Sequence, residues 1–427
     1  MKKYVFLINK IASKIERHEF SNASFWVFIS NSLQNFGNFL FIFLLARILK
    51  PDEYSTSITL ISIMNLIMVP TAIIQLILIS TLSEVRGQRS AKKVSALIHL
   101  FLKLILKISA VLTLVSVLFL RNIANFIHLD NKVYLLIILL IFTVALFYTV
   151  IKSTLLGTFK FKQFAISTSL EITTKVLILA ISILIGLTVK GALFSILGSY
   201  LITGIFISLL IKSTLLNKDR LPRVSIKLAD SAFPATLLLL GITSFYTTDI
   251  ILVKHFFTQQ DVANSPNFYV AASTVGKVIF FGAASIVSIL IPFTRARLTN
   301  KVDSNDVFLI SLTFVIIYSV IIFSVFSFNP KLPLSLLGQV EYMKASHIIF
   351  PFSFFMTILS IIFLISSYLF AIKKYSTVNL VLAAAILQAT GITIFHSSLQ
   401  QVIFVSIVVS IGLLFLLMLQ FKKPVST

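Results

Sequence analysis

Apolar runs of about 20 residues follow one another along the whole chain, separated by short polar connections. A helix of about 20 residues crosses the hydrocarbon core of a bilayer, and only helices or closed barrels satisfy their backbone groups there. The pattern therefore predicts an all-α polytopic membrane protein. We expect about twelve spans, at Phe25–Leu45, Tyr54–Leu82, Ser95–Leu120, Tyr134–Gly157, Phe164–Thr188, Ala192–Ile211, Phe233–Val253, Phe268–Ile291, Val307–Phe328, Ile348–Ile372, Val378–Phe395 and Val402–Phe421.

Lysine and arginine are distributed unevenly between the two sides of the expected membrane region. The connections on one side hold 24 of these residues, including Lys152, and those on the other side hold eight. The more basic side is expected to face the cytoplasm. An even number of spans then places both termini in the cytoplasm, and we expect the inner (cytoplasmic) membrane of a bacterial or archaeal cell. The less basic side holds Arg47, Lys50, Arg121, Lys132, Lys190, Lys254, Lys331 and Lys344.

Composition narrows the class of protein further. The 427 residues are 58% hydrophobic with a mean hydropathy of +1.02, which excludes an ordinary soluble domain. The 36 Lys and Arg against 14 Asp and Glu sit mostly in the connections, so we expect membrane lipids as partners and no nucleic acid. Cysteine is absent, which excludes disulfides. We find no metal-spaced histidines, nucleophile constellation or phosphate loop, and therefore expect neither an enzyme nor a cofactor.

The longest internal connection, residues 212–232, lies near the midpoint of the chain and is expected to be cytoplasmic. It separates an N-terminal lobe, residues 1–211, from a C-terminal lobe, residues 233–427, with six helices each. The segments Leu44–Tyr54 and Ile251–Asp261, which leave the first and seventh helices, are weakly alike and align Arg47 with Lys254. Two such lobes around a central cavity are a transporter architecture.

Only two carboxylates fall within the expected spans, Glu171 and Asp249. A charge at the centre of a membrane helix costs about 2.5–3.5 kcal/mol, so each needs a partner, a cavity or a ligand. Glu171 precedes Lys175 by four residues, which indicates a self-neutralising pair or a pair that lines the cavity. Asp249 is expected either to form a structural ion pair with Lys277, or to serve as a cation or proton relay or as a counter-charge that keeps Lys277 in place; Glu171 is the other candidate for coupling or counter-charge. Lys277 lies too deep to snorkel, which favours a role facing the ligand.

The first helix carries four amides on one face, at spacings typical of a helix. Such amides bond neighbouring helices together, and they are equally suited to sugar hydroxyls because each is both donor and acceptor. The sequence leaves both interpretations open. The four residues are Asn31, Gln34, Asn35 and Asn38.

Four segments resemble the oligosaccharide (O-antigen and polysaccharide) flippases of the multidrug/oligosaccharidyl-lipid/polysaccharide exporter superfamily. They are Leu44–Tyr54, Leu156–Phe164, Asp249–Phe257 and Phe268–Lys277, the last in a helix that Pro292 closes. The resemblance covers essentially the whole chain. It implies two lobes that open alternately to either side, and a polyprenyl-pyrophosphate-linked oligosaccharide as the substrate that moves to the outer leaflet. It also implies pyrophosphate contacts from Arg47, Lys254 and Lys277, with Lys175 as a weaker candidate, and a polysaccharide polymerase or glycosyltransferases as partners.

Three other functions compete with this expectation. A cation-coupled multidrug exporter of the same superfamily would need buried carboxylates, and only Glu171 and Asp249 are available. A different twelve-helix transporter of the major facilitator group would show a GlyXaaXaaXaaAspArg motif between helices two and three, where this chain reads SerGluValArgGlyGlnArgSer. A membrane scaffold or lipid-binding protein without transport would have lost its charges at membrane depth, which this chain keeps.

Overall fold

The computed structural model describes residues 25–27, 29–87, 91–129, 131–215, 231–257, 265–299 and 303–421. Within these ranges the chain is helical, with no β-strand. Twelve helices are long and apolar enough to cross a membrane, so the expected all-α fold with twelve spans is confirmed.

The first six spans and a short helix make up the first half of the chain. They are the first helix Phe25–Ile48, α2 Pro51–Gly87, α3 Ala91–Phe126, α4 Val133–Gly157, α5 Phe161–Leu184 and α6 Val189–Leu210, followed by α7 Lys212–Leu215. The second half holds α8 Ala232–Phe245, α9 Thr248–Phe256, α10 Pro266–Thr299, α11 Asn305–Phe328, α12 Lys331–Ser335, the 3₁₀ helix η1 Val340–Ala345, α13 Ser346–Ala371, α14 Ser376–Ile394 and α15 Leu399–Phe421.

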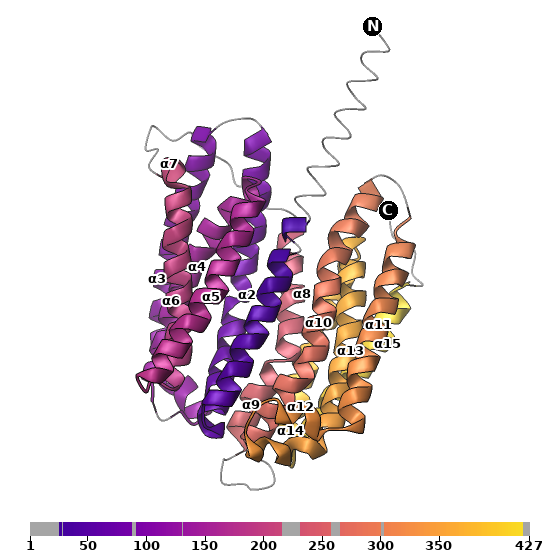
Figure 1. The fold of residues 1–427 in the computed structure, drawn as a ribbon. Helices are drawn as coiled ribbons and strands as arrows, with labels where there is room; N and C mark the ends of the chain where they lie inside the picture. Colours follow the sequence, from indigo (N-terminus) through magenta and orange to yellow (C-terminus); the bar gives the residue numbers. More distant parts are fainter. Residues whose placement is uncertain are drawn as a thin grey trace.

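The helices gather into two lobes, as Figure 1 shows. In the N-terminal lobe α4 packs against α2, α3 and α6, and α5 packs against α6. In the C-terminal lobe α13 packs against α10, α11 and α15, and α8 packs against α14. The lobes meet where α2 packs against α8, α9 and α10. The domain boundaries at 211 and 233 stay a prediction, and residues 216–230 of the expected linker lie outside the described residues.

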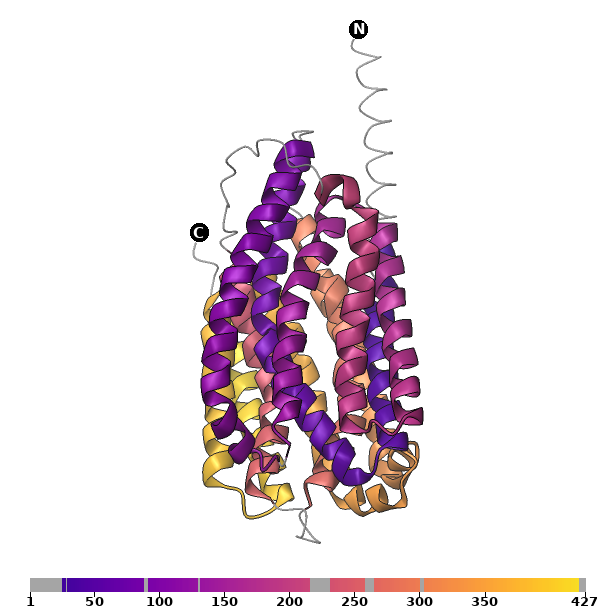
Figure 2. The same ribbon diagram turned by 90° about the vertical axis from the view of Figure 1, so that its left-hand side faces the viewer.

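The helices run along a common axis in both views (Figure 2). The first helix begins and α15 ends at the same end of the bundle, which we call the terminal end (Figure 1). The short helices α9 and α12 lie at the opposite end, the far end. This arrangement is what an even number of spans requires, while the orientation of the terminal end toward the cytoplasm remains a prediction.

The seventh span is interrupted, whereas the sequence predicts one continuous helix at Phe233–Val253. The helix α8 ends at Phe245 and α9 begins at Thr248. Asp249 occupies the first turn of α9, where its Oδ1 accepts the N–H of Ile250 at 2.8 Å. A carboxylate at a helix N-terminus is favoured by the unpaired N–H groups there, which gives a local reason for the break.

Close packing of α8 on α14 depends on Gly241. A Cβ atom at this position would lie 2.7 Å from Val381 Cγ1 and 3.4 Å from the backbone nitrogen of Leu382. We expect Gly241→Val to lower the free energy of unfolding by about 1–3 kcal/mol, the cost of overpacking a filled interface. Gly412→Ala is the matched control, because nothing lies within 4 Å of its added Cβ. Thermal unfolding in detergent measures both variants, and equal midpoints would contradict the packing argument.

Candidate functional site

A cavity of about 290 Å³ lies between the two lobes, and we call it the central cavity. Its walls come from the first helix, α2, α5 and α6 on one side and from α8 and α10 on the other. The lining is partly polar although it lies at membrane depth, which is the arrangement expected around a polar solute rather than around lipid. The lining residues with polar side chains are Asn35, Asn38, Asn65, Lys175, Tyr200, Thr243 and Tyr246.

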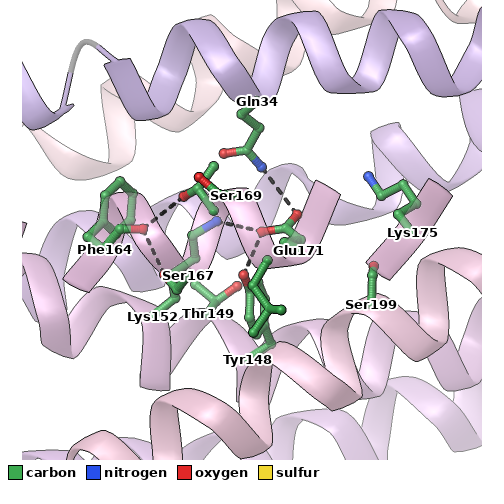
Figure 3. A network of polar contacts seen from close by, with 12 residues as sticks. Gln34, Tyr148, Thr149, Lys152, Phe164, Ser167, Ser169, Glu171, Lys175 and Ser199 are labelled. Atoms are coloured by element: carbon green, nitrogen blue, oxygen red, sulfur yellow. Dashed lines mark hydrogen bonds and ion pairs between the residues drawn. The ribbon is translucent and has the colours of Figure 1, made fainter. Parts of the chain in front are cut away.

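A buried carboxylate sits beside the central cavity in the N-terminal lobe (Figure 3). Glu171 Oε2 accepts hydrogen bonds from Lys152 Nζ at 2.6 Å and from the Tyr148 hydroxyl at 2.5 Å. Its other oxygen, Oε1, accepts from Gln34 Nε2 at 3.3 Å. These donors come from α4 and from the first helix, so three helices converge on one charge. Buried charges are retained only with such pairing and hydrogen bonding.

The expected ion pair between Glu171 and Lys175 is not formed. Lys175 Nζ donates instead to Asn38 Oδ1 at 2.8 Å and lies 5.5 Å from the centre of the Phe41 ring. The carboxylate is bonded to Lys152, which the sequence places in a cytoplasmic connection but which lies inside α4. Glu171 thus pairs with Lys152 on the neighbouring helix α4 and not with Lys175, four residues along its own helix. The reason is that tertiary packing brings Lys152 Nζ within hydrogen-bonding distance of the Glu171 carboxylate.

Lys175 therefore presents its ammonium group to the central cavity, where it is held by a neutral amide. Two ammonium groups, those of Lys152 and Lys175, lie near a single carboxylate, that of Glu171, and of the two lysines Lys152 is the one bonded to it. The cluster holds one excess positive charge when all three groups are ionised. A cavity wall of this kind attracts an anionic group.

Lys277 and Asp249 are not joined by an ion pair within 4 Å, which corrects the first of the two expectations for Asp249. The Asp249 carboxylate is fully buried and accepts the Tyr269 hydroxyl at 2.7 Å. Lys277 Nζ lies 5.5 Å from the centre of the Tyr246 ring, and that ring lines the central cavity. Lys277 thus lies behind an aromatic side chain of the cavity wall.

Arg47 and Lys254 lie at the far end, away from Lys175. Arg47 is exposed, and its Nε donates to the Leu336 carbonyl at 2.9 Å. Lys254 Nζ donates to Thr56 Oγ1 at 3.5 Å and lines a separate cavity of about 380 Å³, the far-end cavity, with Asp52 and Glu53. The structure does not bring these two cations into the central cavity, and their contact with a substrate remains a prediction.

The amide face of the first helix both bonds helices together and lines cavities. Gln34 contacts Glu171 and Asn38 contacts Lys175 within the N-terminal lobe, whereas Asn35 Nδ2 donates to Ser285 Oγ of α10 at 3.3 Å. The first helix therefore bonds to both lobes. Asn31 lines a cavity of about 310 Å³ beside Glu171.

A further cavity of about 350 Å³ lies between the first helix and the helices α10 and α13. The four amides form one of its walls, and apolar side chains form the other. A cavity with one polar and one apolar wall suits an amphipathic molecule. The apolar wall consists of Ala284, Val287, Ile291 and Phe363.

No protein-family model and no curated protein sequence matches the chain. Among solved structures, the chain is similar to the inward-facing conformation of a multidrug resistance MATE family transporter of the MOP superfamily, with a TM-score of 0.68, 14% identity and coverage of 92% of this chain and 94% of that one. It is also similar to the outward-facing conformation of a multidrug resistance MATE family transporter of the MOP superfamily. That match has a TM-score of 0.64 and 14% identity, and it covers 94% of this chain and 94% of that one.

A third solved structure is a MOP superfamily transporter from Pyrococcus furiosus, whose binding pocket of reverse polarity is reported to suggest a different function. It matches with a TM-score of 0.61 and 14% identity, covering 95% of this chain and 96% of that one. The chain has a MATE-like fold. The expected two-lobed fold is thus found, whereas membership in the exporter superfamily and in its flippase branch stays a proposal.

Sequence reasoning missed several side chains of this candidate site. Tyr148 and Lys152 stand four residues apart in the apolar helix α4, a spacing that places both on one face. Two polar side chains on one face of an apolar span indicate a polar contact inside the protein, and this pattern could have identified Tyr148 and Lys152 from the sequence. Asn65 is a single polar residue in an apolar part of α2, and Tyr246 is one of several polar residues at the α8–α9 break, so only the folded chain shows that these two reach the central cavity.

Proposed function

We propose that this protein is a membrane transporter that moves an amphipathic organic molecule across the bilayer by alternating access between its lobes. The observation that carries the proposal is the central cavity, which is polar, lies at membrane depth and takes its walls from both lobes. Rocking of one lobe against the other would expose such a cavity to each side in turn. The similarity to transporters captured in inward-facing and outward-facing conformations supports this reading of the fold.

The substrates that we favour are small amphipathic compounds, which the protein would export. The neighbours in fold include multidrug resistance transporters, which supports the multidrug alternative over the transport of a lipid-linked glycan. The charge of the central cavity refines this proposal. Lys175 faces the cavity while Glu171 is already neutralised by Lys152, so we expect anionic or neutral compounds to bind better than cationic ones.

A lipid-linked oligosaccharide flippase is the second candidate. It is favoured by the cationic Lys175 beside amides that can bond sugar hydroxyls, and by the cavity between the first helix and α10, whose apolar wall could hold a lipid tail. The hydroxyls of a glycan lose water at a cost of several kcal/mol each in hydrocarbon if left unpaired, so such a cavity would be needed. A polysaccharide polymerase or glycosyltransferases are expected as partners only if the protein is such a flippase.

Transport by the purified full-length protein in liposomes separates these proposals. Uptake or release of an anionic fluorescent amphiphile is compared with that of a cationic one of similar size, with protein-free liposomes as the control. Faster movement of the anionic probe is the result we expect. Faster movement of the cationic probe would overturn the assignment of substrate charge.

Lipid-linked sugars in cells test the second candidate. Cells lacking the protein should accumulate a polyprenyl-pyrophosphate oligosaccharide on the cytoplasmic leaflet if it is a flippase, and a rescuing copy should remove it. No accumulation, together with transport of the anionic probe, supports the exporter. No transport in either experiment would leave a membrane scaffold as the explanation. We place the protein in the cytoplasmic membrane with both termini in the cytoplasm, following the distribution of Lys and Arg.

A further inference from the structure

Lys277 lies directly behind one aromatic side chain of the central cavity. Its Nζ lies 5.5 Å from the centre of the Tyr246 ring, and Tyr246 lines the cavity. Lys277 itself lines none of the four cavities described above. The space that the ring fills therefore extends from the cavity toward the ammonium group. The ring separates this charge from a solute in the cavity.

The break between α8 and α9 and two neighbouring rings hold Tyr246 in this position. Its backbone N–H donates to the Thr243 carbonyl at 3.3 Å, directly after the end of α8. The centre of its ring lies 5.1 Å from that of Phe280 and 5.8 Å from that of Phe281. The Tyr246 hydroxyl donates to Thr243 Oγ1 at 3.5 Å, which is long for a hydrogen bond. The position of the ring therefore depends on aromatic packing more than on the hydroxyl.

The ammonium group of Lys277 is not bonded to another side chain. Among the residues that the structure describes, it makes no hydrogen bond and no ion pair within 4 Å. Asp249 attracts it from a longer distance, but the Asp249 carboxylate accepts the Tyr269 hydroxyl and the Ile250 N–H instead. The face of an aromatic ring attracts a cation, so Tyr246 both stabilises and covers the charge. An anion that reached Lys277 would find its N–H donors unoccupied.

The central cavity consequently presents one ammonium group although two lie at its walls. Glu171 and Lys152 neutralise one another and leave Lys175 as the unbalanced charge on the cavity side. A ligand with one negative charge matches this single positive charge. A second negative charge on the ligand would leave water without a counter-charge, and an unpaired charge in a protein interior is costly.

We propose that Tyr246 is a specificity-determining residue that keeps Lys277 out of the central cavity and thereby favours ligands with one negative charge. This inference rests on the proposed function, since it takes an amphipathic organic anion as the ligand, and it narrows that class to monoanions. A pyrophosphate diester carries two negative charges at neutral pH, so the same ring disfavours a lipid-linked glycan. Loss of the ring turns Lys277 into a second contact for an anionic group.

Two aromatic sulfonates with the same ring system test the proposal. Naphthalene-2-sulfonate carries one negative charge, naphthalene-2,6-disulfonate carries two, and both are fully ionised at neutral pH. Isothermal titration calorimetry measures their affinities for the purified full-length protein in a non-ionic detergent. The unmodified protein should bind the monosulfonate more tightly. In Tyr246→Leu, we expect the affinity for the disulfonate relative to the monosulfonate to rise about tenfold, the effect of one added hydrogen bond to a charged group.

Three further variants identify the cause of this gain. Tyr246→Leu combined with Lys277→Met should lose the gain, because the ammonium group is absent. Tyr246→Phe keeps the ring and should keep the preference of the unmodified protein. Phe39→Leu removes a ring from the opposite wall of the central cavity, where no lysine ammonium group lies against it among the residues described. It should change both affinities by the same factor.

A preference of the unmodified protein for the disulfonate would overturn the proposal without any variant. A folded Tyr246→Leu protein without the gain, or a gain that persists after Lys277→Met, would overturn it as well. Failure of the proposed function gives a different result, because calorimetry requires no transport. A protein that shows the expected preferences but moves neither sulfonate across liposome membranes would keep the assignment of Tyr246 and contradict transport.

Binding of neither sulfonate by the unmodified protein and by Tyr246→Leu would overturn both.

Discussion

Replacing Lys175 with methionine is expected to reduce transport of an anionic amphiphile by about 10- to 100-fold. Lys175 is the lysine that lines the central cavity among the residues described, and its Nζ is held by the neutral Asn38 rather than by a carboxylate. An incoming anion can therefore bond to this ammonium without first breaking an ion pair. A hydrogen bond to a charged group contributes about 1.5–3 kcal/mol, and about 1.4 kcal/mol corresponds to a factor of ten.

Methionine keeps most of the length and the apolar part of the lysine side chain, so the variant removes the charge with little change in packing. Its matched control is Lys107→Met. Lys107 is also a lysine in a membrane span, but its side chain is exposed on α3 and lines none of the four cavities described above. Transport of the anionic and cationic probes in liposomes measures both variants. A Lys175→Met protein that inserts normally and still prefers the anionic probe would remove Lys175 from the substrate site.

Replacing Glu171 with leucine is expected to destabilise the protein by about 3–5 kcal/mol, the cost of removing one partner of a buried ion pair. The carboxylate accepts three hydrogen bonds, from Lys152, Tyr148 and Gln34. Its loss leaves the Lys152 ammonium unpaired, with only 12% of that side chain exposed. The Tyr148 hydroxyl loses its acceptor in the same interior.

The double variant Lys152→Met with Glu171→Leu distinguishes a paired charge from a general loss of packing. Replacing both members of a buried pair by apolar residues is often close to neutral. We therefore expect the double variant to be more stable than Glu171→Leu alone. Thermal unfolding of the detergent-solubilised protein measures Glu171→Leu, Lys152→Met alone, the double variant and the unmodified chain. A double variant whose destabilisation equals the sum of the single effects would show that the two charges do not depend on each other.

Predicting the helices was possible because each one is encoded locally. Every apolar run long enough to cross a bilayer became a span, since a backbone in hydrocarbon has to satisfy its own hydrogen bonds. The break in the seventh span was missed because the segment as a whole is apolar enough to count as one span. The polar stretch Thr243–Asp249 lies at the break, but the end of α8 and the start of α9 are shown only by the hydrogen bonds around Thr247 and Asp249.

The sequence by itself determined which residues are costly to place at membrane depth, and it thereby singled out Glu171, Lys175, Asp249, Lys277 and the amides of the first helix. Their partners were decided by tertiary structure alone. Glu171 bonds to Lys152 rather than to the nearby Lys175, and Asp249 bonds to Tyr269 rather than to Lys277. The physical reason is that an ion pair depends on distances between atoms of different helices, whereas hydropathy and helical spacing describe one helix at a time.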